Sequence, residues 1–439
     1  MSHSKTYNRP DRDAQARAEL GQTKISSWTA LYLAALFLLT LISVPLARWN
    51  LEDNAVPGLA SLLSRPAGES WLERNHSAQR QIDAFERQLE ETSPLLRRTL
   101  PHVQNALMHL GRIGNERVYV GRENWLHLRE DVDLLIGPPF LDPAVLERRR
   151  RAAPTWSEGI EPDSRPALFD FAKQLQGLGI RLILIPVPSK AAILPGTLTR
   201  AARGREPENP SMATWRRTLE DGGLEIFDPS ALLRDLQAQG DPAFLRTDTH
   251  WSPRAVDRMA EELAGRLLRR GTLDDESPAI FQRHPLTLRG RGDLLHMLRL
   301  AEPRLAELSE TVEVQQVLTA DGSLWRSDRE ASVLVLGDSF VNVYSDSELG
   351  WGTAAGLAEQ LAFHLQRPVD RLATNGGGAS EVRRRLGLVA REDPERLKRK
   401  TVVLYVFASR ELASGDWQKT KIAVRAGHAA DSGIGLEVR

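Results

Sequence analysis

"SVLVLGDSF", residues Ser332 to Phe340, is the stretch that predicts the fold. Five apolar or small residues lead into Gly337, Asp338 and Ser339. Such a run is typical of a strand buried in a parallel sheet. Sites in open α/β sheets form at the carboxyl ends of strands, where a glycine permits a tight turn and a following serine exposes its Oγ. We therefore expect Ser339 to lie at the carboxyl edge of a buried sheet.

Further strand and helix patterns extend on both sides of this segment. "IRLILIPVP" (Ile180–Pro188) is another continuous apolar run, and a helix is expected from Pro253, a favourable first-turn residue, to about Arg269. The other expected strands are Leu224–Asp228, Val312–Leu318, Val369–Thr374 and Thr401–Glu411, and a second helix is expected near Thr353–Leu365. Strands alternating with helices indicate an α/β fold with a mostly parallel sheet flanked by helices.

The pair Asp248 and His250, in "RTDTHWSP" (Arg246–Pro253), suggests catalytic chemistry. In an extended segment, side chains two positions apart point the same way, so the carboxylate could fix the tautomer of the imidazole ring. Together with Ser339, the pair would complete a Ser-His-Asp triad. The nearby "RGD" at 291–293 matches an adhesion motif, but nothing else in the sequence supports that function.

Composition excludes several classes of function. Lys+Arg and Asp+Glu both number 58, so no basic surplus favours nucleic acid as a partner. The absence of cysteine excludes disulfides, thiolate catalysis and cysteine-based zinc sites. The remaining histidines show no metal-ligand spacing, so neither a metal nor another cofactor is expected. At 439 residues, one large α/β domain with appendages is expected.

An uncharged stretch near the amino terminus predicts a membrane anchor. "WTALYLAALFLLTLISVPLA" (Trp28–Ala47) has twenty residues, which as a helix would span roughly 30 Å, the thickness of a bilayer core. Basic residues are concentrated before it, at Lys5, Arg9, Arg12, Arg17 and Lys24. The positive-inside rule then predicts a single-pass protein of the inner membrane, with a cytoplasmic amino terminus and a periplasmic body.

The predicted organisation therefore has four parts. A cytoplasmic tail (1–27) and a transmembrane signal anchor (28–48) precede a juxtamembrane linker with short helices (49–110), which Pro94 and Pro101 are expected to divide. The catalytic domain is expected over 111–439, opening with a β-hairpin at Val118–Asp131.

These motifs carry a family resemblance. Gly-Asp-Ser after a core strand resembles the nucleophile block of the SGNH hydrolases, in which the Asp-His pair usually follows the serine as D-x-x-H. Here D-x-H precedes the serine by 89 positions. That permuted order, with "GRENWLHLRED", "RTDTHWSP", "GRGDLLHML" and "VLGDSF", resembles the alginate O-acetyltransferase family of periplasmic SGNH-like acyltransferases, over roughly residues 110–417.

The resemblance implies a role for each residue of the triad. Ser339 would be the nucleophile and His250 the general base, and Asp248 would orient the imidazole ring. The serine would accept an acyl group and pass it to a sugar hydroxyl. Besides the Ser339 N–H, the expected oxyanion donors are Asn375 and the backbone of Gly376, although "NGGG" also fits a flexible turn.

Three further residues are candidates for substrate binding, each with a structural alternative. Trp251 could stack on a sugar ring or simply pack. Lys190 follows a core strand and could meet an anionic sugar or be an ordinary solvated lysine. Arg410, after the last strand, could do the same or form an ion pair with Glu411.

The expected function is an exported O-acetyltransferase that acts on an alginate-like exopolysaccharide. The resemblance implies that a membrane-bound O-acyltransferase delivers the acetyl donor. One alternative is a carbohydrate acetylesterase, in which the same triad passes the acetyl group to water. Another is a polysaccharide-binding assembly protein with a vestigial site, which is disfavoured because all three triad positions are filled.

Overall fold

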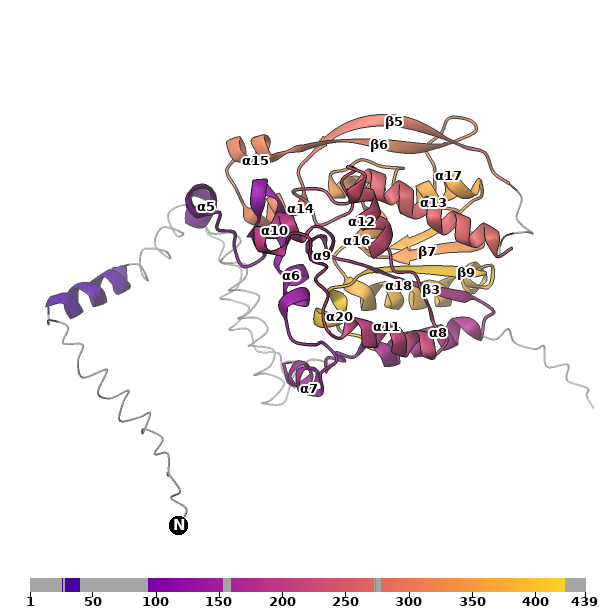
Figure 1. Cartoon of the computed structure of the whole chain (residues 1–439), viewed down its shortest axis with the longest axis horizontal. Coiled ribbons are helices and arrows are strands. Elements are labelled where there is room, and N and C mark those ends of the chain that lie inside the picture. Colours follow the sequence, from indigo (N-terminus) through magenta and orange to yellow (C-terminus); the bar gives the residue numbers. More distant parts are fainter. Residues whose placement is uncertain are drawn as a thin grey trace, which may run out of the picture. The chain divides into compact units, whose positions relative to one another are not determined.

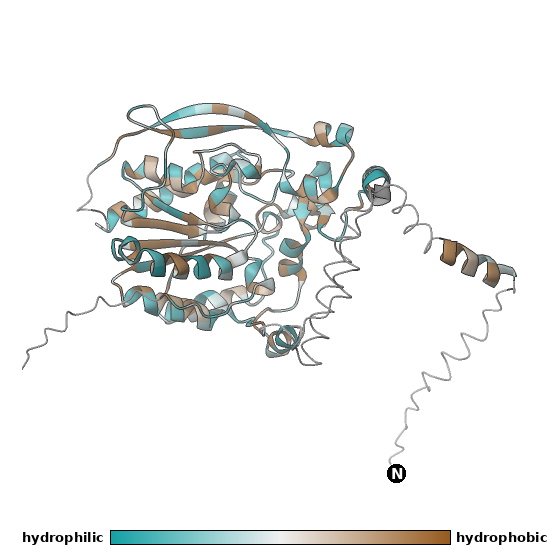
Figure 2. Cartoon of the chain, turned by 180° about the vertical axis from the view of Figure 1, so that it is seen from behind, coloured by the Kyte–Doolittle hydropathy of each residue, from teal (hydrophilic) through white to brown (hydrophobic). Residues whose placement is uncertain are grey.

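The computed structural model describes residues 26, 28–39, 94–152, 159–271, 273 and 278–422 (Figure 1). Residues 49–93 of the predicted linker with short helices, and the final residues, 423–439, lie outside this set. Residues 28–39 form a helix whose large apolar side chains are exposed, among them Trp28 and Leu31 (Figure 2). The rest of the predicted anchor, 40–48, is not among the described residues. Within the described ranges, no helix has both the length and the apolar character needed to cross a membrane.

A parallel sheet of five strands forms the centre of the body. The strand order is β4-β3-β9-β7-β8. The bounds are β3 Arg181–Val187, β4 Glu225–Ile226, β7 Val333–Gly337, β8 Asp370–Ala373 and β9 Val402–Ala408. Every residue of β7 and β9 is buried, because helices cover both faces of the sheet. The predicted parallel sheet flanked by helices is confirmed.

Two helical layers enclose this sheet (Figure 1). One layer contains α8 (Ser164–Gln176), α11 (Met212–Asp221) and α18 (Gly378–Glu392), which pack around Tyr405 and Phe407 of β9. The other contains α12 (Ser230–Ala238), α13 (Pro253–Arg269) and α17 (Leu357–Leu365). The bounds of α13 are those predicted from the sequence. Its amino end is fixed by Ser252, whose Oγ accepts the Ala255 N–H at 3.1 Å.

A small subdomain lies before the first sheet strand. The predicted hairpin is present as β1 (Val118–Val120) and β2 (Leu126–Leu128), joined by η1 (Arg122–Asn124), but its last three predicted residues begin α6 (Arg129–Ile136). The hairpin shares a core with α14 (Asp293–Leu298) and with Met108 of α5 (Pro94–Gly111). Pro101 lies inside α5 and does not divide it as predicted. Buried Gln104 and Met108 hold the helix beyond the proline.

A two-stranded antiparallel ribbon corrects another prediction. "VEVQQVL" belongs to β6 (Glu310–Thr319), which pairs with β5 (Phe281–Gly290) outside the central sheet. Only Val314 and Val317 of β6 are buried, so the strand, unlike β7 and β9, is not buried along its length. The shorter helices are α7 (Pro143–Arg151), α9 (Lys190–Ile193), α10 (Pro195–Leu198), η2 (Arg200–Ala202), α15 (Glu302–Leu308), α16 (Ser339–Asn342), η3 (Ser347–Leu349), α19 (Pro394–Lys398) and α20 (Glu411–Ser414).

Candidate active site

Ser339 lies where the sequence predicts, at the carboxyl end of β7. It is the first residue of α16 and is half-buried. Asp338 fixes this turn, because its Oδ1 accepts the Phe340 N–H at 3.0 Å and its Oδ2 accepts the Ala408 N–H, from the end of β9, at 2.9 Å. At Gly337 a Cβ would lie 2.7 Å from the carbonyl oxygen of Val406 on β9. Only glycine therefore lets the two strands approach this closely.

His250 joins the serine to Asp248 in one chain of hydrogen bonds. Ser339 Oγ lies 2.8 Å from His250 Nε2, and His250 Nδ1 lies 2.6 Å from Asp248 Oδ1. An ionised carboxylate can only accept, so Nδ1 carries the proton and Nε2 is the acceptor for the serine hydroxyl. The backbone bends here and is not extended as predicted, because Asp248 Oδ1 also accepts the His250 backbone N–H at 2.9 Å.

The second oxygen of Asp248 is held as firmly as the first. Oδ2 accepts the Trp351 Nε1–H and the Asp293 backbone N–H, each at 2.9 Å. Burial alone would raise the pKa of Asp248, but adjacent His250 and the hydrogen bonds from His250 and Trp351 outweigh burial and hold that pKa below its usual value. Asp248 therefore stays ionised beside the imidazole.

The pKa of His250 moves in the opposite direction. Burial alone would lower it, but the charge and hydrogen bond of Asp248 outweigh burial, so the pKa of His250 lies above its usual value. The site is therefore built to stabilise a protonated imidazole, which is the state a general base enters when it accepts a proton.

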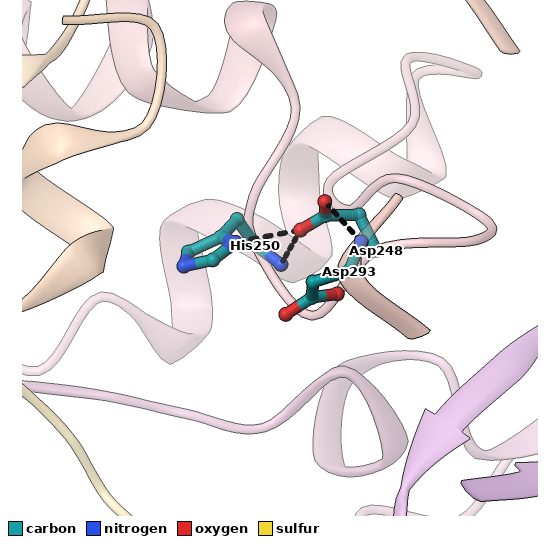
Figure 3. Close-up of side chains that lie close together, drawn as sticks. All are labelled: Asp248, His250 and Asp293. Atoms are coloured by element: carbon teal, nitrogen blue, oxygen red, sulfur yellow. Dashed lines mark hydrogen bonds and ion pairs between the residues drawn. The ribbon is translucent and has the colours of Figure 1, made fainter. Parts of the chain in front are cut away.

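Two more carboxylates hold the loop that carries Asp248 and His250. Asp293 accepts the Thr249 N–H at 2.8 Å, and Figure 3 shows it beside the Asp–His pair. Glu310, at the start of β6, accepts the N–H of Arg246 at 2.9 Å and that of Thr247 at 2.7 Å. The loop is thus fixed from both sides.

Sequence reasoning missed Asp293, Glu310 and Trp351. A signal existed in the glycines of "GRGD". A Cβ at Gly290 would lie 2.6 Å from the Trp351 ring, and one at Gly292 would lie 2.1 Å from the carbonyl oxygen of Thr247. The "RGD" segment therefore packs against the catalytic loop, and Asp293 points into the site rather than outward as an adhesion motif would require.

The cluster of Asp248, His250 and Asp293 also has the composition of a metal site. One potential ligand atom from each residue lies within 4.8 Å of the others. Both oxygens of Asp248 already accept N–H groups, and both ring nitrogens of His250 have partners, namely Asp248 and Ser339. A metal would have to break the bond between the two central residues. The donor set therefore fits a proton relay better than a metal centre.

Lys190 and Trp251 are both buried, so Trp251 packs, as its structural alternative predicted, whereas Lys190 is neither a solvated lysine nor open to a sugar. Lys190 is 1% exposed, and its Nζ donates to the carbonyl oxygens of Leu126 at 2.7 Å and Arg246 at 3.2 Å. Burial lowers the pKa of Lys190 to about 8. The Trp251 ring is covered and donates through Nε1 to the Phe340 carbonyl at 3.1 Å. Through these hydrogen bonds, both residues hold backbone segments next to the site in place.

Arg410 lies next to the site but has a different partner from the one expected. Its Nη1 donates to Asp131 Oδ1 at 3.2 Å, and no ion pair with Glu411 is present within 4.0 Å. Its guanidinium carbon is 6.0 Å from the centre of the Phe340 ring. Because the charge of Arg410 lowers the pKa of His250, it acts electrostatically on the triad.

Asn375 and Gly376 follow β8 and are exposed. The Asn375 side chain donates to Asp346 Oδ2 and accepts from Asn342 Nδ2, both at 2.9 Å. Asn342 is the last residue of α16, the helix that begins with Ser339. The structure therefore links Asn375 to the helix that begins with Ser339, while the amide donor of Asn375 is bound to Asp346. The Ser339 N–H lies in the first turn of α16 and has no acceptor within that helix.

The amino-acid sequence is similar to those of known acetyltransferases. The family model described as SGNH hydrolase-like domain, acetyltransferase AlgX, matches residues 118–403. A probable alginate O-acetylase AlgJ of Pseudomonas aeruginosa is 26% identical over 283 residues, covering 63% of this chain and 62% of that protein. Its counterpart in Pseudomonas fluorescens is 26% identical over 264 residues, covering 56% and 58%. The chain thus spans about three fifths of the length of these curated relatives.

A solved structure, the O-acetyltransferase domain of Pseudomonas putida AlgJ, has the same fold. It is 20% identical to this chain, with a TM-score of 0.50, and the match covers 70% of this chain and 94% of that domain. The family model covers well over half of the chain and includes Asp248, His250 and Ser339. The resemblance seen in the sequence motifs is confirmed: the chain belongs to the family of SGNH hydrolase-like acetyltransferases of the AlgX and AlgJ type.

Proposed function

We propose that the chain is an O-acetyltransferase that transfers acetyl groups to hydroxyls of an alginate-like exopolysaccharide through an acyl-enzyme on Ser339. The observation that carries the proposal is the unbroken hydrogen-bond chain from Ser339 through His250 to Asp248, at the carboxyl edge of the sheet. The half-buried serine is open to a substrate, whereas its two supporting residues are covered.

The reaction would proceed in two steps. Ser339 Oγ attacks the acetyl carbonyl while its proton passes to His250 Nε2, and the leaving group takes that proton as the acetyl-serine ester forms. A sugar hydroxyl then loses its proton to His250 and attacks the ester, and the proton returns to Ser339 Oγ. Asp248 remains ionised and stabilises the imidazolium in both steps.

The oxyanion of each tetrahedral intermediate would be held by the Ser339 N–H. Asn375 and the Gly376 N–H remain proposals for further donors, supported by the bond between Asn375 and Asn342 of α16. The Asn375 amide would have to leave Asp346 to serve. Arg410 adds positive charge near the site, which would favour the developing negative charge.

The cellular setting is part of the proposal. Residues 28–48 would anchor the chain in the inner membrane with its body in the periplasm, and a membrane-bound O-acyltransferase would deliver the acetyl donor. The exposed apolar side chains of the 28–39 helix support an anchor, because they would otherwise face water. The charge asymmetry on the two sides of this helix supports the orientation.

The alternative function is a carbohydrate acetylesterase, in which water replaces the sugar hydroxyl at the second step. The triad geometry serves both reactions, because they differ only in the acceptor. Both require the acetyl-serine. An assembly protein with a vestigial site would not form it.

Intact-mass measurement tests the shared mechanism first. The full-length chain, treated with an activated acetyl ester, should gain one acetyl group, and Ser339→Ala should gain none. An oligosaccharide acceptor should then discharge the label faster than water does if the chain is a transferase. Release of acetate at the same rate with and without the sugar would identify an esterase. Full activity in Ser339→Ala would disprove the acyl-enzyme and both functions.

A further inference from the structure

A cavity of about 440 Å³ lies between the β1–β2 hairpin, the α9–η2 segment and α12. Its volume is in the range of small-molecule sites. None of the triad residues lines it. The residues that give it chemical character are Arg122, Trp125, Arg203, Arg205, Glu206 and Arg234.

The cavity has a surplus of positive charge. Four arginines line it, against two glutamates, Glu123 and Glu206. Both glutamate side chains are largely exposed, at 78% and 69%, so their pairs with Arg122 and Arg234 are weak. Among the described residues, no acidic side chain pairs with Arg203 or Arg205 within 4.0 Å. The arginines are therefore available to an anion from outside.

Two side chains on the wall of the cavity, Arg234 and Trp125, also favour a ligand. Arg234 lies on the wall of the cavity with its side chain 32% exposed, and its Nη1 lies 3.4 Å from the exposed carboxylate of Glu206. The half-buried Trp125 offers an aromatic ring on the wall of the cavity. Guanidinium groups bind carboxylates in a bidentate manner, and an amphipathic indole ring suits the face of a sugar. Together these groups suit an acidic sugar residue.

The hairpin tip beside this cavity has an unusual backbone conformation. Glu123 and Asn124, at the tip of the hairpin, have φ values of 54° and 60°, in the left-handed region that disfavours ordinary side chains. Strain of this kind persists where the surrounding structure holds it and is common at ligand sites. Glu123 is thus held in a conformation that its side chain does not favour, whereas asparagine, as at position 124, adopts it more readily.

The cavity lies at the same edge of the sheet as the nucleophile. α9 and α10 follow the carboxyl end of β3, as Ser339 follows that of β7, and only β9 separates these strands. Two strand spacings put β3 and β7 ~10 Å apart. The hairpin is also tied to the catalytic loop, because the Leu126 N–H donates to the Arg246 carbonyl at 2.9 Å. A polymer bound in the cavity could therefore place a neighbouring sugar at Ser339.

We propose that this cavity is an acceptor subsite that binds a carboxylate-bearing sugar residue of an anionic polysaccharide. Arg203 and Arg205 bind the carboxylate, Arg234 adds positive charge on the cavity wall, and Trp125 supports the sugar ring. The subsite positions the chain so that a hydroxyl of another residue meets the acyl-serine. This inference rests on the proposed function, since it assigns the polymer that the same site would acetylate.

Equilibrium binding tests the subsite. Full-length Ser339→Ala, which holds the acceptor without reacting, is titrated with a polyuronate oligosaccharide and with a neutral oligosaccharide of equal length. We expect the polyuronate to bind more tightly, and Arg203→Gln/Arg205→Gln in the same background to weaken it about tenfold. The matched control is Arg384→Gln/Arg399→Gln, which removes two exposed arginines from elsewhere on the surface. Melting curves confirm that each variant is folded.

The outcomes separate this proposal from the proposed function. Equal polyuronate affinity in the two double variants, or equal affinity for the acidic and neutral oligosaccharides, overturns the subsite. Acetyl labelling of the wild-type serine is measured in parallel. If the serine is labelled but the arginines have no effect on affinity, the subsite fails and the acyl-enzyme stands. If the arginines control affinity but the serine is never labelled, the cavity binds the polymer and the acyl-enzyme fails.

Discussion

Burial and the neighbouring Asp248 shift the pKa of His250 in opposite directions, and the effect of Asp248 is larger. The pKa is raised, so the neutral form needed to accept the serine proton is lost as the pH falls through a value above the usual 6.5. The same shift stabilises the folded chain below the pKa of an unfolded histidine, and this contribution is lost as the pH rises through the folded pKa. As the pH rises through the pKa of His250, activity should therefore increase while the contribution of His250 to stability is lost.

Asp248→Asn should reveal this coupling. The variant should fold, lose about 10⁴-fold in the rate of Ser339 acetylation, and move the acid limb of its pH–rate profile to lower pH. Asp257→Asn is the matched control, because Asp257 also contacts a histidine, His364 Nε2 at 2.7 Å, outside the triad. A rate within a few-fold of wild type in Asp248→Asn would remove Asp248 from the mechanism.

Among the individual residues of the site, those marked by a short local motif could be predicted from the sequence. Asp248 and His250 are two positions apart, and Ser339 ends a recognisable strand, so local patterns identify all three. Trp351 and Asp293 contact Asp248 from 103 and 45 positions away. Their contacts depend on tertiary packing. For the same reason, the burial of Lys190 and Trp251 could not be read from their neighbours along the chain.

At the turn before α14, the backbone at Gly292 packs directly against the loop that carries Asp248. A Cβ at Gly292 would lie 2.1 Å from the Thr247 carbonyl oxygen, which belongs to the loop that carries Asp248. Gly292→Ala must therefore displace that loop. We expect at least about a tenfold loss in acetylation rate and about 1–3 kcal/mol lost from the free energy of unfolding, measured by denaturant titration. Gly159→Ala, where an added Cβ would have no atom of the described residues within 4 Å, should change neither quantity.

Lys190 ties α9 to both the hairpin and the catalytic loop, at an electrostatic cost. Its pKa is about 8 in the folded chain against an ordinary 10.5, so the unfolded chain binds more protons between these pH values. The free energy of unfolding should therefore rise with pH in this window, by roughly 2–3 kcal/mol relative to Lys190→Met. Lys398→Met, at an exposed lysine of α19, is the control. Parallel pH profiles for wild type and Lys190→Met would contradict a charged, buried Lys190.

The strands differ in how far their patterns could be interpreted. β3, β7 and β9 are continuous apolar runs, and all three lie in the central sheet, as such runs predict. β6 alternates polar and apolar residues only over Thr311–Gln315, and Gln315 and Gln316 interrupt its apolar residues. Those polar residues were the available signal against placing Val312–Leu318 in the buried sheet. Its partner β5 carries too many polar residues to stand out as a strand.

Across the whole molecule, the parallel sheet explains how Asp248, His250 and Ser339 come together although their order along the chain is permuted. Asp248 and His250 lie on the loop before α13, whereas Ser339 follows β7, and the two segments meet because both lie at the carboxyl edge of the sheet. A triad needs only this meeting in space, so its order along the chain can change. The sheet also places the arginine-lined cavity on the same edge, which the order of motifs alone could not indicate.

The proposed orientation of the chain in a membrane rests on the sequence from 28 to 48 and on the charges around it. If this stretch spans the bilayer with basic residues inside, a reporter active only in the periplasm should work when fused after residue 60 and be silent when fused after residue 20. Replacing Lys5, Arg9, Arg12, Arg17 and Lys24 with glutamine should weaken this difference, because it removes the charge that keeps the amino terminus in the cytoplasm. The opposite reporter pattern would put Ser339 in the cytoplasm, out of reach of an exported polysaccharide. The acceptor would then have to be sought among intracellular sugars, even if every contact of the triad were correct.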